Sequence, residues 1–239
     1  MSDIDFFRGS HNPASFFQSL AFDFRFYQDN PFYFQPAGIW CFCGAQGSGK
    51  TLSAVKCCKA LLHEYPGAVL CSNMDIHGID NPIIPFTDYE QIKTIKNGTY
   101  GVIFFIDELH VLWNSLESKK IPFEEMACFC QMRKDRRVIL GTSQVYSRIA
   151  KPIREQLRYV IKCRNVLKYL QINQIIDPNA DGYSGEQDGH LDGELISTQW
   201  FFHKPEDYKA YDTLNKIERM SRSVGIGSRG HVEVSVCSQ

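Results

Sequence analysis

The sequence GAQGSGKT at residues 44–51 matches the pattern G-x-x-x-x-G-K-[ST] at every fixed position. Glycines at these spacings let consecutive backbone N–H groups turn toward one point, where they can surround the phosphates of a nucleotide. In such a loop the Lys50 ammonium reaches the β- and γ-phosphates, and the Thr51 hydroxyl binds Mg²⁺. The motif therefore predicts a site for ATP and Mg²⁺. The predicted nucleotide-binding residues are Gly44, Ala45, Gln46, Gly47, Ser48, Gly49, Lys50 and Thr51.

The residues on either side of this loop have the pattern that a phosphate-binding loop requires. The apolar run GIWCFC at 38–43 is typical of a β-strand. After the loop, apolar residues recur at helical spacing until Pro66 and Gly67 end the segment. The alternative is a glycine-rich turn between a strand and a helix that binds nothing. The complete motif in this context argues against that alternative.

The segment VIFFIDELH at 102–110 contains the residues that would make a nucleotide-binding site hydrolytic. Asp107 follows an apolar strand, where its carboxylate can hold Mg²⁺ through water. Glu108 comes next and can polarise the attacking water as a general base. The alternative is an acidic pair on the surface at the end of a strand. Because the phosphate-binding motif lies upstream, we predict an ATPase in which Asp107 binds the metal and Glu108 is catalytic.

Strand-like and helix-like patterns alternate along the middle of the chain. This alternation predicts an α/β fold, with a parallel sheet between two layers of helices. A helix is expected to begin near Thr87, because Thr87 and Glu90 have the spacing of a capping box, and to end before Asn97-Gly98. The predicted strands are 38–43, 68–73, 101–106, 137–143 and 158–163.

The layout divides the chain into three regions. An aromatic-rich N-terminal arm, residues 1–37, lacks clean periodicity and is expected to pack on the core or on a neighbouring subunit. Residues 38–164 form the predicted P-loop ATPase core. Residues 165–239 are expected to form a C-terminal β-hairpin at 165–203, a helix and a flexible tail. The loop at 177–188 has turn residues at EF-hand-like positions, and a hairpin loop explains them better than a calcium site.

The composition excludes several classes of protein. Hydrophobic residues make up 44% of the chain, which is enough for a core and argues against disorder. A net charge of −1 argues against a globally basic protein that coats DNA. None of the nine cysteines forms a C-x-x-C motif, so they are interpreted as reduced, buried thiols of a cytoplasmic protein. The longest apolar run, VIFFI, is too short to span a bilayer.

The order of the motifs GAQGSGKT, SNMDI, FFIDELH and QMRKDRRVILGTSQ resembles that of the zonula-occludens-toxin-like ATPases, the filamentous-phage assembly type within the FtsK/HerA superfamily. The resemblance covers residues 38–164 well and the rest of the chain poorly. It implies a P-loop ATPase of the additional-strand class, as in RecA- and FtsK-like proteins. It also implies ATP hydrolysis coupled to DNA translocation during virion assembly or export. The implied assembly is a homo-oligomeric ring, with proteins of a phage or mobile element as partners.

The same resemblance implies two further site residues. Gln144 matches the polar residue that senses the γ-phosphate after the strand 137–143. Arg133 matches the arginine that reaches into the nucleotide site of the neighbouring subunit, with Arg136 and Arg137 as less favoured substitutes. The alternative interpretation of Arg133 is a solvated arginine at a helix end, where basic residues are common.

Two other functions stay open from the sequence. Filamentous-phage assembly proteins usually carry a membrane-spanning segment after the ATPase domain, and this chain shows none. Any membrane association would then occur through partners, and a genome-packaging ATPase of a tailless virus becomes an alternative. A nucleotide-gated assembly scaffold that does not pump DNA is the second. The basic clusters at 119–120 and 131–137 are either solvated helix ends or phosphate contacts in the channel of a ring.

Overall fold

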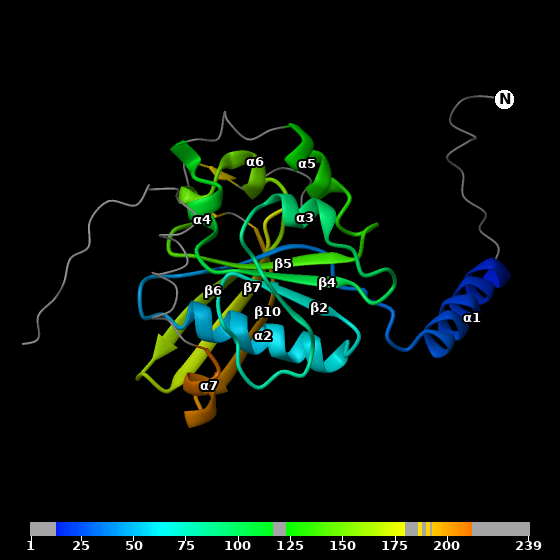
Figure 1. Cartoon of the computed structure of the whole chain (residues 1–239), viewed down its shortest axis with the longest axis horizontal. Helices are drawn as coiled ribbons and strands as arrows, with labels where there is room; N and C mark the ends of the chain where they lie inside the picture. The colour runs from blue at the N-terminus through cyan, green and yellow to red at the C-terminus, as the bar shows by residue number, and fades with distance from the viewer. Residues whose placement is uncertain (1–12, 117–122, 180–185, 188–189, 192, 212–239) are drawn as a thin grey trace, which may run out of the picture.

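A computed structural model describes residues 13–116, 123–179, 186–187, 190–191 and 193–211 of the chain. An eight-stranded sheet lies at its centre, with the strand order β10-β7-β6-β1-β5-β4-β2-β3. Helices lie on both faces of this sheet (Figure 1). The three-layer α/β/α fold that the sequence predicts is therefore confirmed.

The elements have the following bounds. The strands are β1 (Gly38–Cys43), β2 (Val69–Ser72), β3 (Ile83–Pro85), β4 (Val102–Ile106), β5 (Arg137–Ser143), β6 (Leu157–Val166), β7 (Leu170–Asp177), β8 (Glu186–Gln187), β9 (His190–Leu191) and β10 (Glu194–Phe202). The helices are α1 (Pro13–Asp29), α2 (Lys50–Glu64), α3 (Glu90–Thr94), α4 (Leu109–Leu112), α5 (Phe123–Cys130), α6 (Lys151–Arg154) and α7 (Pro205–Lys209), together with the short 3₁₀ helix η3 (Tyr146–Arg148).

The strands from β6 to β3 run parallel to one another. β5 lies between β1 and β4, so an additional strand separates the strand before the glycine-rich loop from the strand before Asp107. β4 is buried at every position because other layers cover both of its faces, which explains its uninterrupted apolar sequence VIFFI. Since parallel strands end at the same edge of a sheet, the segments that follow β1, β2, β4 and β5 meet there.

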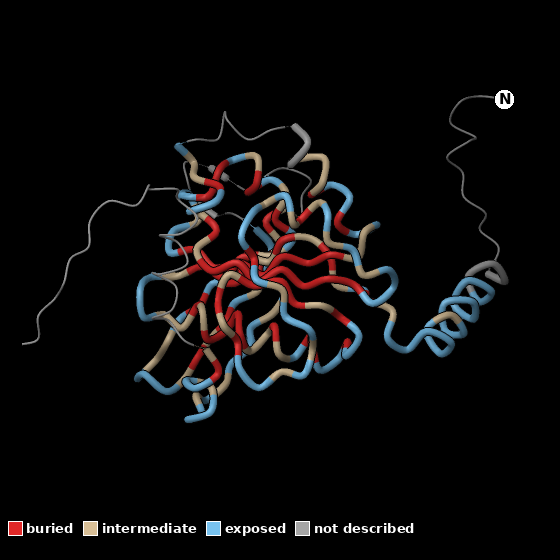
Figure 2. Tube along the Cα trace, in the orientation of Figure 1, coloured by how far each residue is buried: buried red, intermediate tan, exposed pale blue. Residues whose placement is uncertain are grey.

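Two apolar cores lie on the two faces of the sheet. α2 and α7 lie on one face, and α3, α4, α5 and α6 lie on the other (Figure 1). Alternate side chains of each strand enter the two cores. Phe42 and Leu140 pack in the core of α2, whereas Cys41 and Ile139 pack in the opposite one. The buried residues concentrate along the strands between these layers (Figure 2).

β6, β7 and β10 form an antiparallel meander that extends the sheet beyond β1. The predicted hairpin at 165–203 is present, because β10 pairs with β7 along its length. β6 is longer than the predicted strand 158–163, since its last residues pair with β7. A tight turn at Leu167 and Lys168, both with positive φ, joins β6 to β7.

Two predicted C-terminal features are described only in part. α7 begins at Pro205, where the sequence places the start of a helix. The rest of that predicted helix and the predicted tail fall in residues 212–239, outside the described residues. Much of the 177–188 loop, including Asp181 and Asp188, also lies outside them.

The helix predicted after Thr87 is shorter than expected, because α3 spans only Glu90–Thr94. The capping contacts also come from a different residue. The side-chain oxygen of Gln91 accepts hydrogen bonds from the backbone N–H groups of Thr87 (2.6 Å) and Asp88 (3.1 Å). Gln91 therefore makes the reciprocal contact that the spacing assigned to Glu90.

α1 is a helix in the arm, which the sequence pattern did not predict. From Phe17 onward its side chains are exposed, apart from a half-buried Phe26, and the helix stands away from the sheet (Figure 1). Phe34 attaches the arm to the body: its N–H donates to the carbonyl of Thr99 (3.0 Å), and its ring occupies the space where Gly101 lacks a side chain. The sequence predicts that the arm packs either on the core or on a neighbouring subunit, and α1 does not pack on the core.

Among the described helices, α1 included, none combines the length and apolarity needed to cross a membrane.

Candidate active site

The glycine-rich loop connects β1 to α2 at the carboxyl edge of the sheet. Gly47 (φ 77°) and Gly49 (φ 81°) have left-handed backbone conformations, which glycine adopts without strain. Gly49 also has no room for a side chain, because a Cβ atom there would lie 2.1 Å from Oε1 of Gln171. The loop thus leads into the first turn of α2, whose N–H groups have no partners within the helix and favour an anion.

Two polar side chains are buried within this loop. Lys50 is buried and its Nζ donates to the carbonyl oxygen of Ala45 (3.1 Å), so the ammonium lies across the loop. The hydroxyl of Ser48 is buried too, and it has no hydrogen-bond partner among the residues that the structure describes. Both groups are donors of the kind that phosphate oxygens accept, which fits the predicted ligand.

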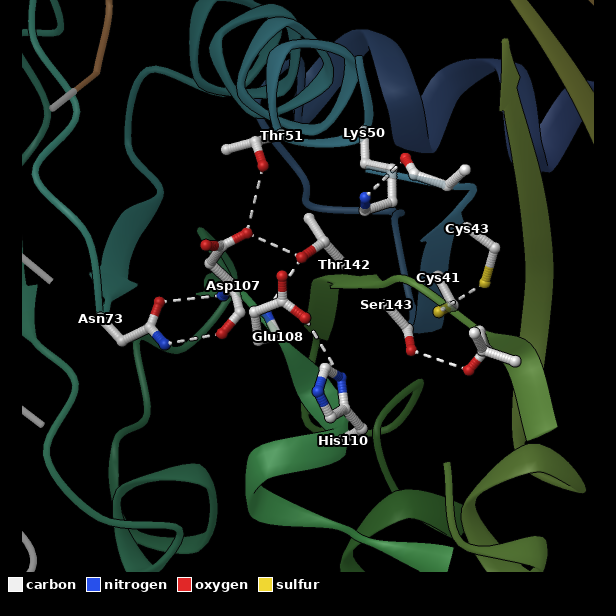
Figure 3. A network of polar contacts seen from close by, with 12 residues as sticks. Cys41, Cys43, Lys50, Thr51, Asn73, Asp107, Glu108, His110, Thr142 and Ser143 are labelled. Atoms are coloured by element: carbon white, nitrogen blue, oxygen red, sulfur yellow. Dashed lines mark hydrogen bonds and ion pairs between the residues drawn. The ribbon is translucent and has the colours of Figure 1, made fainter. Parts of the chain in front are cut away.

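Asp107 is the centre of a polar network at the ends of β4 and β5 (Figure 3). Its Oδ1 accepts hydrogen bonds from the hydroxyls of Thr142 (2.7 Å) and Thr51 (3.3 Å). A hydroxyl and a carboxylate at this separation are hard oxygen ligands of the kind that Mg²⁺ prefers. The donor set at Thr51 and Asp107 therefore fits the predicted metal.

Asn73, directly after β2, holds the backbone of Asp107 in place. Its Oδ1 accepts from the Asp107 N–H (2.9 Å), and its Nδ2 donates to the Asp107 carbonyl (3.1 Å). This paired contact replaces the strand-to-strand bonds that are missing beyond the end of β4. Sequence analysis did not select Asn73, although its position after the neighbouring parallel strand was a usable signal.

Glu108 has a strained backbone and a directed side chain. Its φ of 64° lies in the left-handed region, which is uncommon for a residue with a side chain. Its N–H donates to the Thr142 hydroxyl (2.9 Å), which fixes this conformation. Its Oε2 lies 3.1 Å from Nδ1 of His110, and both of these buried atoms make no other hydrogen bond within the described ranges. The carboxylate is thereby held beside the Asp107 network (Figure 3).

Thr142 is the residue that joins the acidic pair, since its hydroxyl donates to Asp107 and accepts from Glu108. The resemblance instead predicts that Gln144, after this strand, is the polar residue that senses the γ-phosphate. Gln144 is exposed and directly follows β5, on the same edge as the glycine-rich loop. The structure gives Gln144 no side-chain contact with the acidic pair among the described residues, and its sensing role stays a prediction.

The three candidate arginines occupy different environments. Arg137 is fully buried, and its guanidinium donates to the carbonyls of Ile92 and Lys93 (2.9 Å to the latter). Arg136 donates to the hydroxyl of Tyr33 (3.0 Å) and stacks on its ring, which ties it to the arm of its own chain. Arg133 is exposed in the turn between α5 and β5. Arg137 and Arg136 are thus occupied within the subunit, and Arg133 is the accessible one.

Arg133 lies at the opposite edge of the sheet from the glycine-rich loop. β5 begins at Arg137, which pairs with Val102 at the start of β4, and ends at Ser143 beside Cys43. Arg133 precedes this strand, so it does not join the site of its own chain. Contact with a neighbouring subunit's site stays a prediction.

The meander contacts the glycine-rich loop through β7, which sequence analysis did not predict. Gln171 is fully buried, and its Nε2 donates to the carbonyl of Ser48 (2.9 Å) and to Oδ1 of Asn173 (3.1 Å). The same Asn173 oxygen accepts from the hydroxyl of Ser53 in α2 (3.0 Å). Two neighbouring polar residues on one face of β7 therefore support both the loop and the helix that follows it.

The cysteines near the site are unsuited to nucleophilic chemistry. A hydrogen bond between the thiols of Cys41 and Cys43 (3.4 Å), together with burial, raises the pKa of Cys41 well above its usual value. Burial also raises the pKa of Cys163, under the glycine-rich loop, to about 12. These thiols are therefore protonated at neutral pH, and the thiolate is the reactive form.

Solved structures with a similar arrangement include the N-terminal domain of zonular occludens toxin from Neisseria meningitidis. It matches with a TM-score of 0.51 and 15% identity, over 74% of this chain and 99% of that one. A second solved ATPase domain matches with a TM-score of 0.50 and 11% identity, over 82% and 98% of the two chains. This chain has a P-loop NTPase fold. The resemblance to zonula-occludens-toxin-like ATPases is thereby confirmed at the level of the fold.

A third similar structure is the genome packaging NTPase B204 from Sulfolobus turreted icosahedral virus 2, in complex with AMPPCP. It has a TM-score of 0.48 and 12% identity, over 71% of this chain and 98% of that one. No protein-family model and no curated protein matches the sequence.

Proposed function

We propose that this protein is a Mg²⁺-dependent ATPase whose hydrolysis drives DNA movement during the assembly, export or packaging of a virus or mobile element. The observation that carries the ATPase part is the network in which Thr142 joins Asp107 to Glu108, directly opposite Thr51 of the glycine-rich loop. This network supports the proposal, because the oxygens of Thr51 and Asp107 suit Mg²⁺ and the Glu108 carboxylate lies at the same edge of the sheet.

Each residue of the site has a defined task in this proposal. The N–H groups of residues 44–51 and the Lys50 ammonium bind the phosphates, and Ser48 adds a donor. Thr51 and Asp107 hold Mg²⁺, which neutralises the charge that develops on the phosphate oxygens. The Glu108 carboxylate accepts a proton from the attacking water. The water oxygen forms a bond to the γ-phosphorus, and the bond from that phosphorus to the β,γ-bridging oxygen breaks, which gives ADP and phosphate.

The DNA partner and the ring are the finer parts of the proposal. A homo-oligomeric ring would bring Arg133 of one subunit to the nucleotide bound by the next subunit. Gln144 of the subunit that binds the nucleotide would contact its γ-phosphate. The arm supports self-association, because Phe17, Leu20 and Phe24 form an exposed apolar stripe on α1. α1 contains one arginine and no lysine, a composition that suits a second protein copy better than an anionic membrane surface. A cytoplasmic location agrees with this assignment.

The test is a steady-state ATPase assay with and without Mg²⁺, single-stranded DNA and double-stranded DNA. We expect turnover that requires Mg²⁺ and rises when DNA is added. Lys50→Ala should weaken ATP binding, because the ammonium contacts the phosphates directly. Absence of Mg²⁺-dependent turnover in the wild-type chain would refute the ATPase. Turnover that no DNA stimulates would leave an ATPase and favour the nucleotide-gated scaffold over the DNA motor.

A further inference from the structure

The meander has two faces with different roles. Gln171 and Asn173 point from β7 toward the glycine-rich loop and α2. Side chains alternate along a strand, so Ile172 points to the other side. The residues paired with it, Arg164 on β6 and Trp200 on β10, share that side.

We name this side the outer face of the meander. The strand register arranges it as three rows, each with one residue from β6, β7 and β10. The rows are Lys162, Gln174 and Thr198; Arg164, Ile172 and Trp200; and Val166, Leu170 and Phe202. Neighbouring strands are about 4.8 Å apart, so the backbones of β6 and β10 lie about 10 Å apart, with β7 between them.

Large aromatic rings are exposed on the outer face. The exposed fraction is 65% for Trp200 and 63% for Phe202. Their ring centroids are 5.9 Å apart with an interplanar angle of 80°, so the two rings form one adjacent pair on β10. Rings of this size are usually covered in a folded protein, and an exposed pair therefore indicates a binding surface.

The charge of the outer face identifies the kind of partner. Lys162 and Arg164 are exposed, and neither has an ion-pair partner within the described part of the chain. None of the residues in the three rows is acidic. Cations beside exposed rings on an open sheet match a single-stranded nucleic acid, whose phosphates pair with the cations while its bases stack on the rings. A duplex hides the faces of its bases, so it could use only the cations.

We propose that the outer face of the meander binds single-stranded DNA, with Trp200 and Phe202 stacking on bases and Arg164 and Lys162 contacting phosphates. The inference rests on the proposed function for its DNA partner. It adds the form of the DNA and the surface that holds it. Because Gln171 and Ile172 are neighbours on β7, a strand that touches DNA on one face touches the glycine-rich loop on the other.

Wild-type binding is measured first. Trp40 donates its indole N–H to the Ala37 carbonyl (3.1 Å) and Trp113 is buried, which leaves Trp200 as the exposed indole. A deoxythymidine oligomer of about 16 nucleotides should therefore quench tryptophan fluorescence, because a base stacks on Trp200. The same sequence annealed into a duplex should quench much less. Equal quenching by both forms would overturn the inference.

Variants then locate the surface by anisotropy of a labelled oligomer. Trp200→Ala should weaken binding about tenfold, from the loss of one stacked base. Arg164→Gln should weaken binding and flatten the slope of log K against log salt by about 0.7, the value for one phosphate contact on a single strand. Arg158→Gln is the matched control: it removes the same charge from the same strand, outside the three rows, and should behave as wild type.

Three results would contradict the inference. The first is wild-type affinity in both Trp200→Ala and Arg164→Gln proteins that melt at the wild-type temperature. The second is equal weakening by the Arg158→Gln control. The third is quenching of Trp200 by increasing protein concentration alone, which would assign the face to a protein contact. DNA binding is measured without ATP. The DNA-binding inference can therefore be refuted while the Mg²⁺-dependent ATPase is supported, and the ATPase can be refuted while DNA binding is supported.

Discussion

The two halves of the sheet, the parallel strands and the antiparallel meander, place their polar residues differently. In the parallel half, β1, β4 and β5 end at one edge, and polar residues at or just beyond those ends form a network around Asp107. In the meander, the antiparallel strands present polar support on one face and exposed rings with cations on the other. Under the proposed function, the parallel half holds the residues for hydrolysis, and the meander supports the glycine-rich loop through Gln171.

The largest expected effect tests whether the chemistry lies in the parallel half. Glu108→Gln keeps the size of the side chain and removes the base, so turnover should fall about 10⁴-fold. ATP binding, measured by calorimetry, should stay near the wild-type value because Lys50 and the loop amides are unchanged. Lys50→Ala is the opposite control and should lose binding. Near-normal turnover by Glu108→Gln would place the base elsewhere.

The next effect tests whether one chain contains the whole site. Arg133→Ala should lower turnover about 10³-fold, since an arginine at the γ-phosphate stabilises the charge of the transition state. Mixing the inactive Arg133→Ala and Glu108→Gln proteins should restore part of the activity, because some interfaces then contain both intact residues. Mixed rings that form and remain inactive would show that Arg133 is only a solvated turn residue.

A smaller loss is expected at the residue that joins the acidic pair. Thr142→Val removes the hydroxyl that donates to Asp107 and accepts from Glu108, and turnover should fall about 10- to 100-fold, as for other residues that position a metal ligand. Thr142→Ser keeps the hydroxyl and should restore most of the rate. If valine and serine give the same rate, the hydroxyl does not position the pair.

The contact between the two halves is expected to contribute mainly to stability. Gln171→Leu removes the side-chain donor to the Ser48 carbonyl and one of the two donors to Oδ1 of Asn173, which should cost about 1–3 kcal/mol. For a chain of this size each kcal/mol lowers the melting temperature by about 2–4 °C. Stimulation of turnover by DNA should fall as well. Gln174→Leu, on the outer face of the same strand, is the control for stability alone and should leave the melting temperature unchanged. An unchanged melting temperature in Gln171→Leu would mean that the meander does not support the loop.

The smallest effect compares one buried thiol from each half of the sheet. Burial raises the pKa of Cys71 in β2 and of Cys163 in β6 from 9.0 to about 12. The folded state thus keeps these thiols protonated, so their contribution to stability is complete below pH 9.0 and is lost as the pH rises toward about 12. At about pH 8 a maleimide should label both thiols slowly and equally, compared with exposed Cys130. Faster labelling of Cys163 would show that the meander opens more readily.

The parallel half could be predicted because its signals are local. The glycine-rich motif, the run VIFFI and the acidic pair each lie within a few residues, and the rule that parallel strands end at one edge brings them together. Arg137 shows where local reasoning stops. Its position in the basic segment 131–137 gave no sign that its guanidinium is buried against Ile92 and Lys93.

The meander and the arm were harder to predict for physical reasons. The contact of Gln171 with Ser48 joins residues far apart in sequence, and it depends on a strand register that alternation alone does not determine. α1 has aromatic residues on more than one side, so its helical period is obscured. Thr142 was passed over in favour of Gln144 because both are polar, and the sequence does not show that β5 ends at Ser143, with Thr142 inside the strand and Gln144 beyond it.

The left-handed backbone conformation of Glu108 lowers the stability of the fold at the position whose side chain the proposed hydrolysis requires. A side chain in this conformation costs roughly 1–3 kcal/mol, and a glycine there would avoid that cost. Glu108→Gly could thus produce a chain that melts at or above the wild-type temperature and hydrolyses nothing. Engineering this protein by thermal screening alone would select against its proposed base, and a collection of stabilised variants must be sorted by turnover before any is regarded as improved.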